Sequence, residues 1–247
     1  MKKILLTFLI PLLLSPLAYS QSTYSFKELG KTKEYREYDD QGVISSILKQ
    51  EVVRVTADSV YYKTTMLDKD ERPIENIDSF TDVMTIDADG TTHSYLSYSF
   101  NNILKVIPNL VTDSLSQDSE DSVDASSLGA IFDDIELTEN SINIPRNLKV
   151  GMELDEYEMK IKILVMTMKA FVEDRKVVAK ETVTTPTGTY DCFVIESENV
   201  IKAMLVGSEK TYKREWYTLE LGLVKSESYS DKKKRKLISR GEIYRVY

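Results

Sequence analysis

The sequence has one cysteine, one histidine and one tryptophan, with only 9 glycines and 6 prolines among its 247 residues. A single cysteine excludes a disulfide scaffold and a multi-cysteine zinc site, and a single histidine excludes a histidine-rich metal site. The scarcity of glycine and proline excludes collagen-like and low-complexity chains. The formal net charge of −8 argues against general nucleic-acid binding, which needs a basic surface. We therefore expect no metal, no cofactor and no nucleic-acid partner.

The overall composition indicates a packed, β-rich protein. Apolar residues make up 42% of the chain, a fraction that suits a globular domain. The chain contains 15 tyrosines and many valine, isoleucine and threonine residues, which favour β-strands.

Residues 1–20 have the pattern of a cleaved export signal. Two lysines precede an apolar run over residues 4–17, and Ala18 and Ser20 stand at the third and first positions before a signal-peptidase site. The alternative is a membrane anchor, but a spanning helix needs about 20 apolar residues, and two prolines interrupt this shorter run. We expect an exported protein, in the periplasm, in the envelope or secreted, whose mature chain is a single domain over residues 21–247 without a membrane-spanning segment.

Turn signals between alternating runs predict antiparallel hairpins in the first half of the mature chain. One hairpin is expected over residues 43–68, and a second joins residues 80–87 to residues 91–99 across an Asp-Gly turn. Apolar residues then recur at helical spacing, which predicts a short helix over residues 99–107 that ends before Pro108.

Residues 112–127 change in character, because acidic residues alternate there with serines. Such a segment buries little apolar surface and is expected to be a mobile loop. The alternative is a calcium site, since carboxylates at close spacing can supply oxygen ligands. The spacing does not match an EF-hand loop, so we favour the solvated loop.

The C-terminal half predicts a meander of short antiparallel strands with a turn about every ten residues. The expected strands cover residues 158–172, 176–185, 189–197, 200–206, 210–219, 223–229 and 237–247. The strand 158–172 is apolar on both faces, so one face needs a cover besides the main core. If the helix 99–107 covers it only partly, an apolar groove lined by Leu164, Met166 and Met168 remains. If the helix seals the strand, no groove remains.

Candidate catalytic residues are few. His93 is the only histidine that could act as a base, and we interpret it as a surface residue because no third group that would orient it is identifiable. Cys192 lies in a dense strand pattern and is expected to be a buried thiol. The basic run at residues 232–236 is either a solvated turn or a contact for an anionic surface. A hydrolase built on a carboxylate pair is not excluded by 40 acidic residues, but no catalytic motif supports it.

Three motifs carry a resemblance to a known family. Residues 148–154 open the C-terminal half, and Pro-x-Gly-x-aromatic-Asp-Cys occupies residues 186–192. Trp-Tyr at residues 216–217 is followed by Gly-apolar-Val-basic-Ser-Glu at residues 222–227. In combination these motifs resemble the exported TapB-like proteins of bacterial envelopes, a family of unknown function. The residues themselves have folding roles, since Trp216 is expected to be a core anchor with its indole N–H bonded.

The resemblance implies a secreted β-domain with one strongly curved antiparallel sheet, a half-barrel or open barrel like that of lipoprotein carriers such as LolA, with one or two short helices. We expect a non-enzymatic envelope protein whose sheet binds an apolar or amphipathic ligand, a lipid or another envelope component. The alternatives are a structural or interaction protein without a ligand cavity and, less favoured, a carboxylate-based hydrolase.

Overall fold

The computed structural model describes residues 23–74, 79–95, 135–163, 166–203, 207–234 and 236–247. The described part of the chain contains thirteen strands, and it contains no helix long and apolar enough to cross a membrane. The strands are β1 (Thr32–Asp39), β2 (Ile44–Val55), β3 (Ser59–Leu67), β4 (Phe80–Ile86), β5 (Thr92–Ser94), β6 (Ile135–Glu139), β7 (Ile142–Ile144), β8 (Tyr157–Ile163), β9 (Met166–Thr185), β10 (Gly188–Ala203), β11 (Gly207–Thr218), β12 (Gly222–Tyr229) and β13 (Leu237–Val246).

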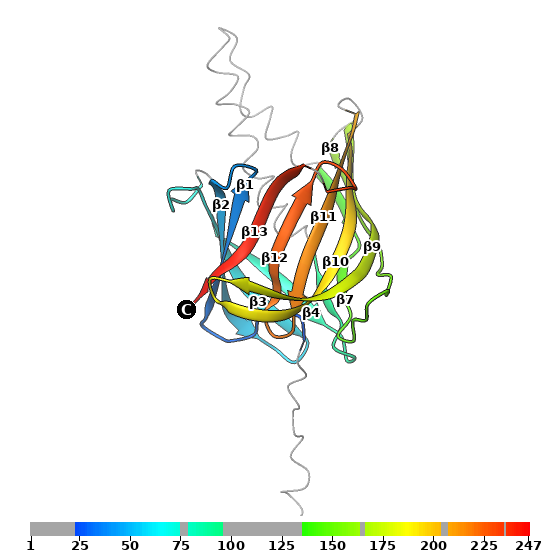
Figure 1. The fold of residues 1–247 in the computed structure, drawn as a ribbon. Coiled ribbons are helices and arrows are strands. Elements are labelled where there is room, and N and C mark those ends of the chain that lie inside the picture. Colours follow the sequence, from blue (N-terminus) through cyan, green and yellow to red (C-terminus); the bar gives the residue numbers. More distant parts are fainter. Residues whose placement is uncertain (1–22, 75–78, 96–134, 164–165, 204–206, 235) are drawn as a thin grey trace, which may run out of the picture.

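All thirteen strands form one antiparallel sheet that curves into a nearly closed barrel (Figure 1). Their order is β6-β8-β9-β10-β11-β12-β13-β1-β2-β3-β4-β5-β7. The two edge strands, β6 and β7, follow each other in the sequence across Asn140 and Ser141. The sheet must therefore curve far enough to bring its two edges together. This architecture confirms the predicted strongly curved antiparallel sheet.

Arg175 of β9 links the edge strand β7 to the opposite end of the sheet, where the barrel closes. Its side chain is buried, and its guanidinium donates to the carbonyl oxygens of Asp155 at 2.6 Å and Asn143 at 3.1 Å. The Asn143 amide donates in turn to the Asp155 carboxylate at 3.1 Å. A buried guanidinium is stable only when its donors find acceptors, so these bonds fix β7 against β9 and the segment that precedes β8.

The long strands β9 and β10 bend, and the end of their hairpin crosses in front of β11, β12 and β13 (Figure 1). Two irregularities of strand pairing in β10, at Val194/Ile195 and Glu196/Glu198, permit the bend. The hairpin covers a buried cluster that contains Trp216 and Cys192. Burial raises the pKa of the Cys192 thiol to about 11. Both the core position of Trp216 and the buried thiol are confirmed.

Several strand predictions are confirmed, and two are wrong. The two early hairpins correspond to β2-β3 and β4-β5. The predicted strand 158–172 is instead two antiparallel strands, β8 and the start of β9, with Met159 opposite Ala170. The sequence between them contains no glycine, proline or asparagine that would mark a break. The break expected between strands 189–197 and 200–206 is absent, because β10 continues through Glu198 and Asn199 with only an irregularity of pairing there. The predicted helix 99–107 and the predicted loop 112–127 lie outside the described residues.

Candidate functional site

A cavity of about 410 Å3 lies inside the barrel. Strands β1 to β5, β7, β11 and β12 contribute side chains to its wall. Its volume falls within the range typical of small-molecule binding sites. The cavity is therefore large enough to hold a ligand and is our candidate site.

The residues that face the cavity alternate along the strands, because successive side chains in a strand point to opposite faces of the sheet. In β1 and β2 the inward residues are Lys33, Tyr35, Glu37, Ser46, Leu48 and Gln50. Leu48, Met66, Met84, Ile142 and Leu223 supply an apolar surface from five different strands. The cavity thus combines a soft apolar wall with a few polar groups, the usual composition of a ligand pocket.

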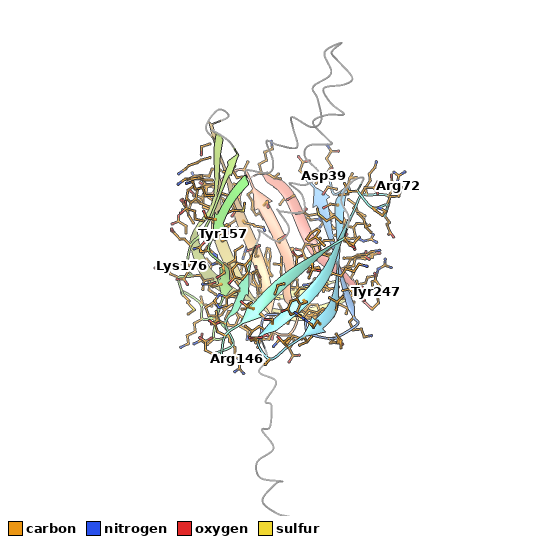
Figure 2. All side chains as sticks on the ribbon, turned by 180° about the vertical axis from the view of Figure 1, so that it is seen from behind. Asp39, Arg72, Arg146, Tyr157, Lys176 and Tyr247 are labelled. Atoms are coloured by element: carbon orange, nitrogen blue, oxygen red, sulfur yellow. The ribbon has the colours of Figure 1, made fainter. Side chains whose placement is uncertain are left out.

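Residues 23–26 close one end of the barrel, the lower end in Figure 1. Phe26 is 1% exposed and packs against Val52, Val60 and Tyr62. The Tyr62 hydroxyl donates to the Phe26 carbonyl at 2.8 Å. Figure 2 labels Asp39 and Arg72 at the opposite end of the barrel. The N-terminal segment therefore forms the floor of the cavity.

Gly222 lets this floor approach the turn between β11 and β12. Its φ of +75° lies in the left-handed region that favours glycine. A side-chain Cβ at this position would lie 2.8 Å from the Tyr24 carbonyl oxygen. The glycine of the predicted closing motif is thus required for contact between the turn and the floor.

Three polar side chains of β11 form a connected group on the inner face. The Lys213 ammonium lies 2.9 Å from the Glu215 carboxylate, and the Tyr217 hydroxyl donates to the same carboxylate at 3.4 Å. The negative charge of Glu215 raises the pKa of Lys213. Burial, followed by the charge of Glu215, raises the pKa of Tyr217 well above its usual value. At neutral pH the group is an ion pair with a neutral tyrosine beside it.

Lys33 is the second lysine that lines the cavity, and its ammonium has a different environment. It donates to the Leu221 carbonyl at 3.3 Å, near the floor, and has no ion-pair partner among the described residues. Burial lowers the pKa of Lys33 to about 8. Among the residues that the structure describes, no carboxylate compensates the charge of this lysine.

This environment predicts a pH-dependent stability difference between the wild-type protein and Lys33→Met. The folded pKa of about 8 lies below the ordinary lysine value of about 10.4, so the unfolded chain binds more protons between these values. Wild-type stability should therefore rise relative to Lys33→Met as the pH increases from 8 to 10.5. Urea unfolding at a series of pH values measures this difference. The exposed Lys31→Met variant is the matched control, and a wild-type curve parallel to that of Lys33→Met would contradict the burial of this charge.

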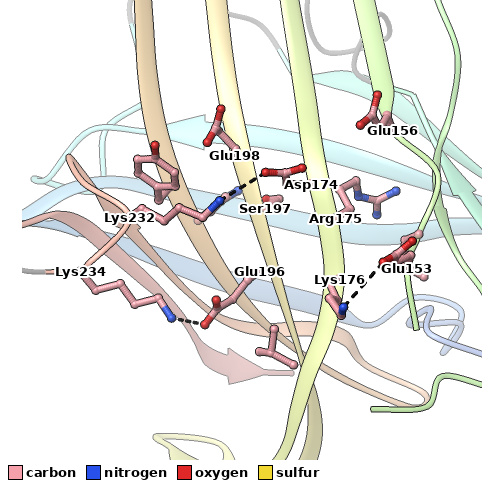
Figure 3. Close-up of a pocket in the computed structure, with 14 residues that line it drawn as sticks. Glu153, Glu156, Asp174, Arg175, Lys176, Glu196, Ser197, Glu198, Lys232 and Lys234 are labelled. Carbon is pink, nitrogen blue, oxygen red and sulfur yellow. Dashed lines mark hydrogen bonds and ion pairs between the residues drawn. The ribbon is translucent and has the colours of Figure 1, made fainter. Parts of the chain in front are cut away.

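A second depression, about 470 Å3 in volume, lies between β9, β10, β11 and the turn after β12 (Figure 3). Its lysines are paired: Lys232 with Asp174 at 3.4 Å, Lys234 with Glu196, and Lys176 with Glu153 at 3.6 Å. The described residues of the basic run at 232–236 lie between β12 and β13, as the turn interpretation predicted. Because its lysines already bind carboxylates of the same chain, this depression is less suited to a charged ligand than the inner cavity.

His93 lies beside two further polar residues, so the expectation that no group orients it is wrong. Its Nε2 is 2.9 Å from the Asp87 carboxylate, and its Nδ1 is 3.0 Å from the Ser141 hydroxyl. The resemblance to a catalytic triad is incomplete, because the Ser141 hydroxyl donates to Asn143 at 2.5 Å. His93 therefore connects the β4-β5 hairpin to the residues at the start of β7. Asp87 is six positions away across the predicted hairpin, whereas Ser141 is 48 positions away and carried no signal in the sequence.

The predicted groove residues cannot be compared side chain by side chain with the inner cavity. Leu164 falls outside the described residues, and Met166 and Met168 belong to the start of β9, where their side chains are not described. The methionines that line the inner cavity are instead Met66 and Met84. Both lie within the predicted hairpins, where no local pattern distinguishes them as residues of a cavity wall.

A family model for DUF3108-like domains matches residues 111–243, more than half of the 247 residues. The chain belongs to the DUF3108-like family. The matched region includes the strands from β6 to most of β13, and therefore Arg175, the β9-β10 hairpin and the β11 side of the cavity. The sequence of this chain matches no curated protein.

Two solved structures share the fold of this DUF3108-like protein. One is described as a candidate exported protein with a YmcC-like fold from Bacteroides fragilis NCTC 9343, with 19% identity and a TM-score of 0.64. The other is described as a candidate lipoprotein from Parabacteroides distasonis ATCC 8503, with 17% identity and a TM-score of 0.65. Each comparison covers 92% of this chain and 99% of the other. At these identities the comparisons show a shared fold.

Proposed function

We propose that this chain is a non-enzymatic, exported envelope protein whose barrel holds an apolar or amphipathic ligand. The observation that carries the proposal is the inner cavity of about 410 Å3, in which aliphatic and methionine side chains lie beside a few polar groups. Binding is favoured over catalysis because the hydroxyl nearest to His93 donates to Asn143. The function rests on the cavity and not on the groove first expected at Leu164, Met166 and Met168.

Export is supported by the signal pattern of residues 1–20 and by the descriptions of the two structural relatives, one as exported and one as a lipoprotein. The resemblance to TapB-like proteins and to carriers such as LolA agrees with the same location. These features support a location in the envelope, and the inner cavity supports ligand binding there.

Export predicts that the mature protein begins at Gln21, since Ala18 and Ser20 occupy the positions that signal peptidase recognises. Intact-mass measurement on protein isolated from the native envelope should give the mass of residues 21–247. Retention of residues 1–20 would contradict the proposed location without affecting the fold.

Ligand binding predicts that Leu48→Trp weakens the binding of 1-dodecanol at least tenfold, because the larger side chain fills part of the cavity that the ligand needs. Leu48 faces the cavity from β2, whereas Val53 of the same strand is 44% exposed. Val53→Trp is therefore the matched control and should bind like the wild-type protein. Isothermal titration of the three proteins measures the effect.

Equal binding by Leu48→Trp and the wild-type protein would place the ligand elsewhere. Absence of binding to the wild-type protein by 1-dodecanol and by its anionic analogues would leave the structural or interaction role as the better account.

A further inference from the structure

Lys33 is the cation of the inner cavity that lacks a charged partner, and its surroundings point to the chemistry of the ligand. An ammonium group carries three donors. The structure uses one of them in the bond of 3.3 Å to the Leu221 carbonyl. Because Lys33 lines the cavity, its remaining donors are accessible to a ligand there.

The other charged side chains that line the cavity are already engaged. Lys213 pairs with Glu215, Glu37 accepts a hydrogen bond from Ser46 at 3.2 Å, and Asp82 accepts one from Thr64. None of these carboxylates offsets the effect of burial on the pKa of Lys33. A carboxylate partner for the ammonium is therefore missing within the described part of the chain, where the Leu221 carbonyl is its acceptor.

The apolar part of the wall completes the site. Leu48 of β2 pairs with Met66 of β3. Gln50, two residues further along β2, pairs with Lys33 of β1. A ligand that fills the cavity thus meets a cation near the floor and methionine and leucine side chains beside it. A molecule with one anionic end and one apolar chain satisfies both environments.

We propose that the ligand is an anionic amphiphile whose carboxylate or phosphate binds the Lys33 ammonium near the floor of the barrel while its apolar chain lies along the wall. This inference rests on the proposed ligand-binding function and specifies the ligand class. A charged pair is strong when water is excluded from it, and the anion removes the cost of burying an unpaired ammonium. A neutral head group cannot do so.

The test compares dodecanoate, dodecyl phosphate and 1-dodecanol by isothermal titration of the mature chain. Both anions should bind at least tenfold more tightly than the alcohol at pH 7. At pH 9 only about one tenth of a lysine with a pKa of about 8 is protonated, so anion binding to the wild-type protein should weaken about tenfold. Binding of the alcohol should stay constant. The relative affinities of the two anions then distinguish a carboxylate from a phosphate as the natural head group.

Two variants separate the charge from the packing of Lys33. Lys33→Met should bind both anions at least tenfold more weakly than the wild-type protein does. Its affinity for 1-dodecanol should stay unchanged, which also shows that the cavity is intact. Lys33→Arg should keep the preference and lose the decrease between pH 7 and pH 9, because arginine stays charged. Lys31→Met, at an exposed position, should behave like the wild-type protein.

Equal binding of the alcohol and the anions, or an undiminished anion preference in Lys33→Met, would overturn the anionic ligand and leave the proposed ligand-binding function standing. Failure of all three probes to bind the wild-type protein would overturn both proposals.

Discussion

Replacing Trp216 with alanine is expected to lower the free energy of unfolding by about 3–5 kcal/mol, the range for truncating a buried tryptophan. Trp216 is 3% exposed and packs with Cys192, Val194 and Val224 beneath the β9-β10 hairpin. Its indole N–H donates to the Glu181 carboxylate at 2.9 Å. The substitution therefore creates a cavity and also removes a partner of Glu181. Equilibrium unfolding in urea measures the loss.

The control for this prediction is Tyr247→Ala, which truncates an aromatic side chain that is 50% exposed and should change stability little. A loss below about 1 kcal/mol for Trp216→Ala, in the range of ordinary surface changes, would show that the hairpin does not pack on the sheet in solution.

Phe26→Ala should also cost about 3–5 kcal/mol, because Phe26 is 1% exposed and fills the floor of the barrel. It precedes β1 and contacts β2 and β3 through Val52 and Val60. Loss of the ring should loosen the floor as well as the core. Urea unfolding measures the stability, and titration with 1-dodecanol reports on the cavity above the floor.

Leu29→Ala is the matched control, since Leu29 lies three residues further along the chain and is 68% exposed. Tyr62→Phe tests the floor separately, because it leaves the Phe26 carbonyl without its hydrogen bond of 2.8 Å and should cost about 1–3 kcal/mol. Near-zero effects of both Phe26→Ala and Tyr62→Phe would mean that residues 23–26 are not part of the domain.

Local signals were sufficient for much of the sheet. The Asp-Gly turn predicted the β4-β5 hairpin, and alternation predicted β11, β12 and β13 because each turn beside them is marked by glycine or by charged residues. The closing tryptophan motif also identified a core anchor correctly. These features depend on residues within a few positions of each other, which a sequence displays directly.

Other features depend on contacts between distant segments. The sequence between β8 and β9 contains no residue that marks a break, so these strands could not be separated by pattern alone. The closure of the barrel depends on Arg175 and on Asn143, which lie 32 positions apart. The sequence does not show that Arg175 is buried, and its need for acceptors follows only from that burial.

The candidate site shows the same limit. The chain offers many lysines, and nothing in the local sequence of β1 distinguishes Lys33, which faces the cavity, from the exposed Lys31. The distinction arises because Lys33 lies within β1, on the face that lines the cavity, whereas Lys31 precedes the strand. The Leu221 carbonyl that accepts from Lys33 belongs to a turn 188 positions away. The cavity could therefore be anticipated as a consequence of a curved sheet, but its lining could not.

Native mass spectrometry of the protein isolated from its own envelope tests ligand binding inside the barrel most directly. The wild-type protein and Val53→Trp should each carry one non-covalently bound amphiphile, whereas Leu48→Trp, with its cavity filled, should carry none. A wild-type protein without bound amphiphile, or the same amphiphile retained by Leu48→Trp, would contradict the account.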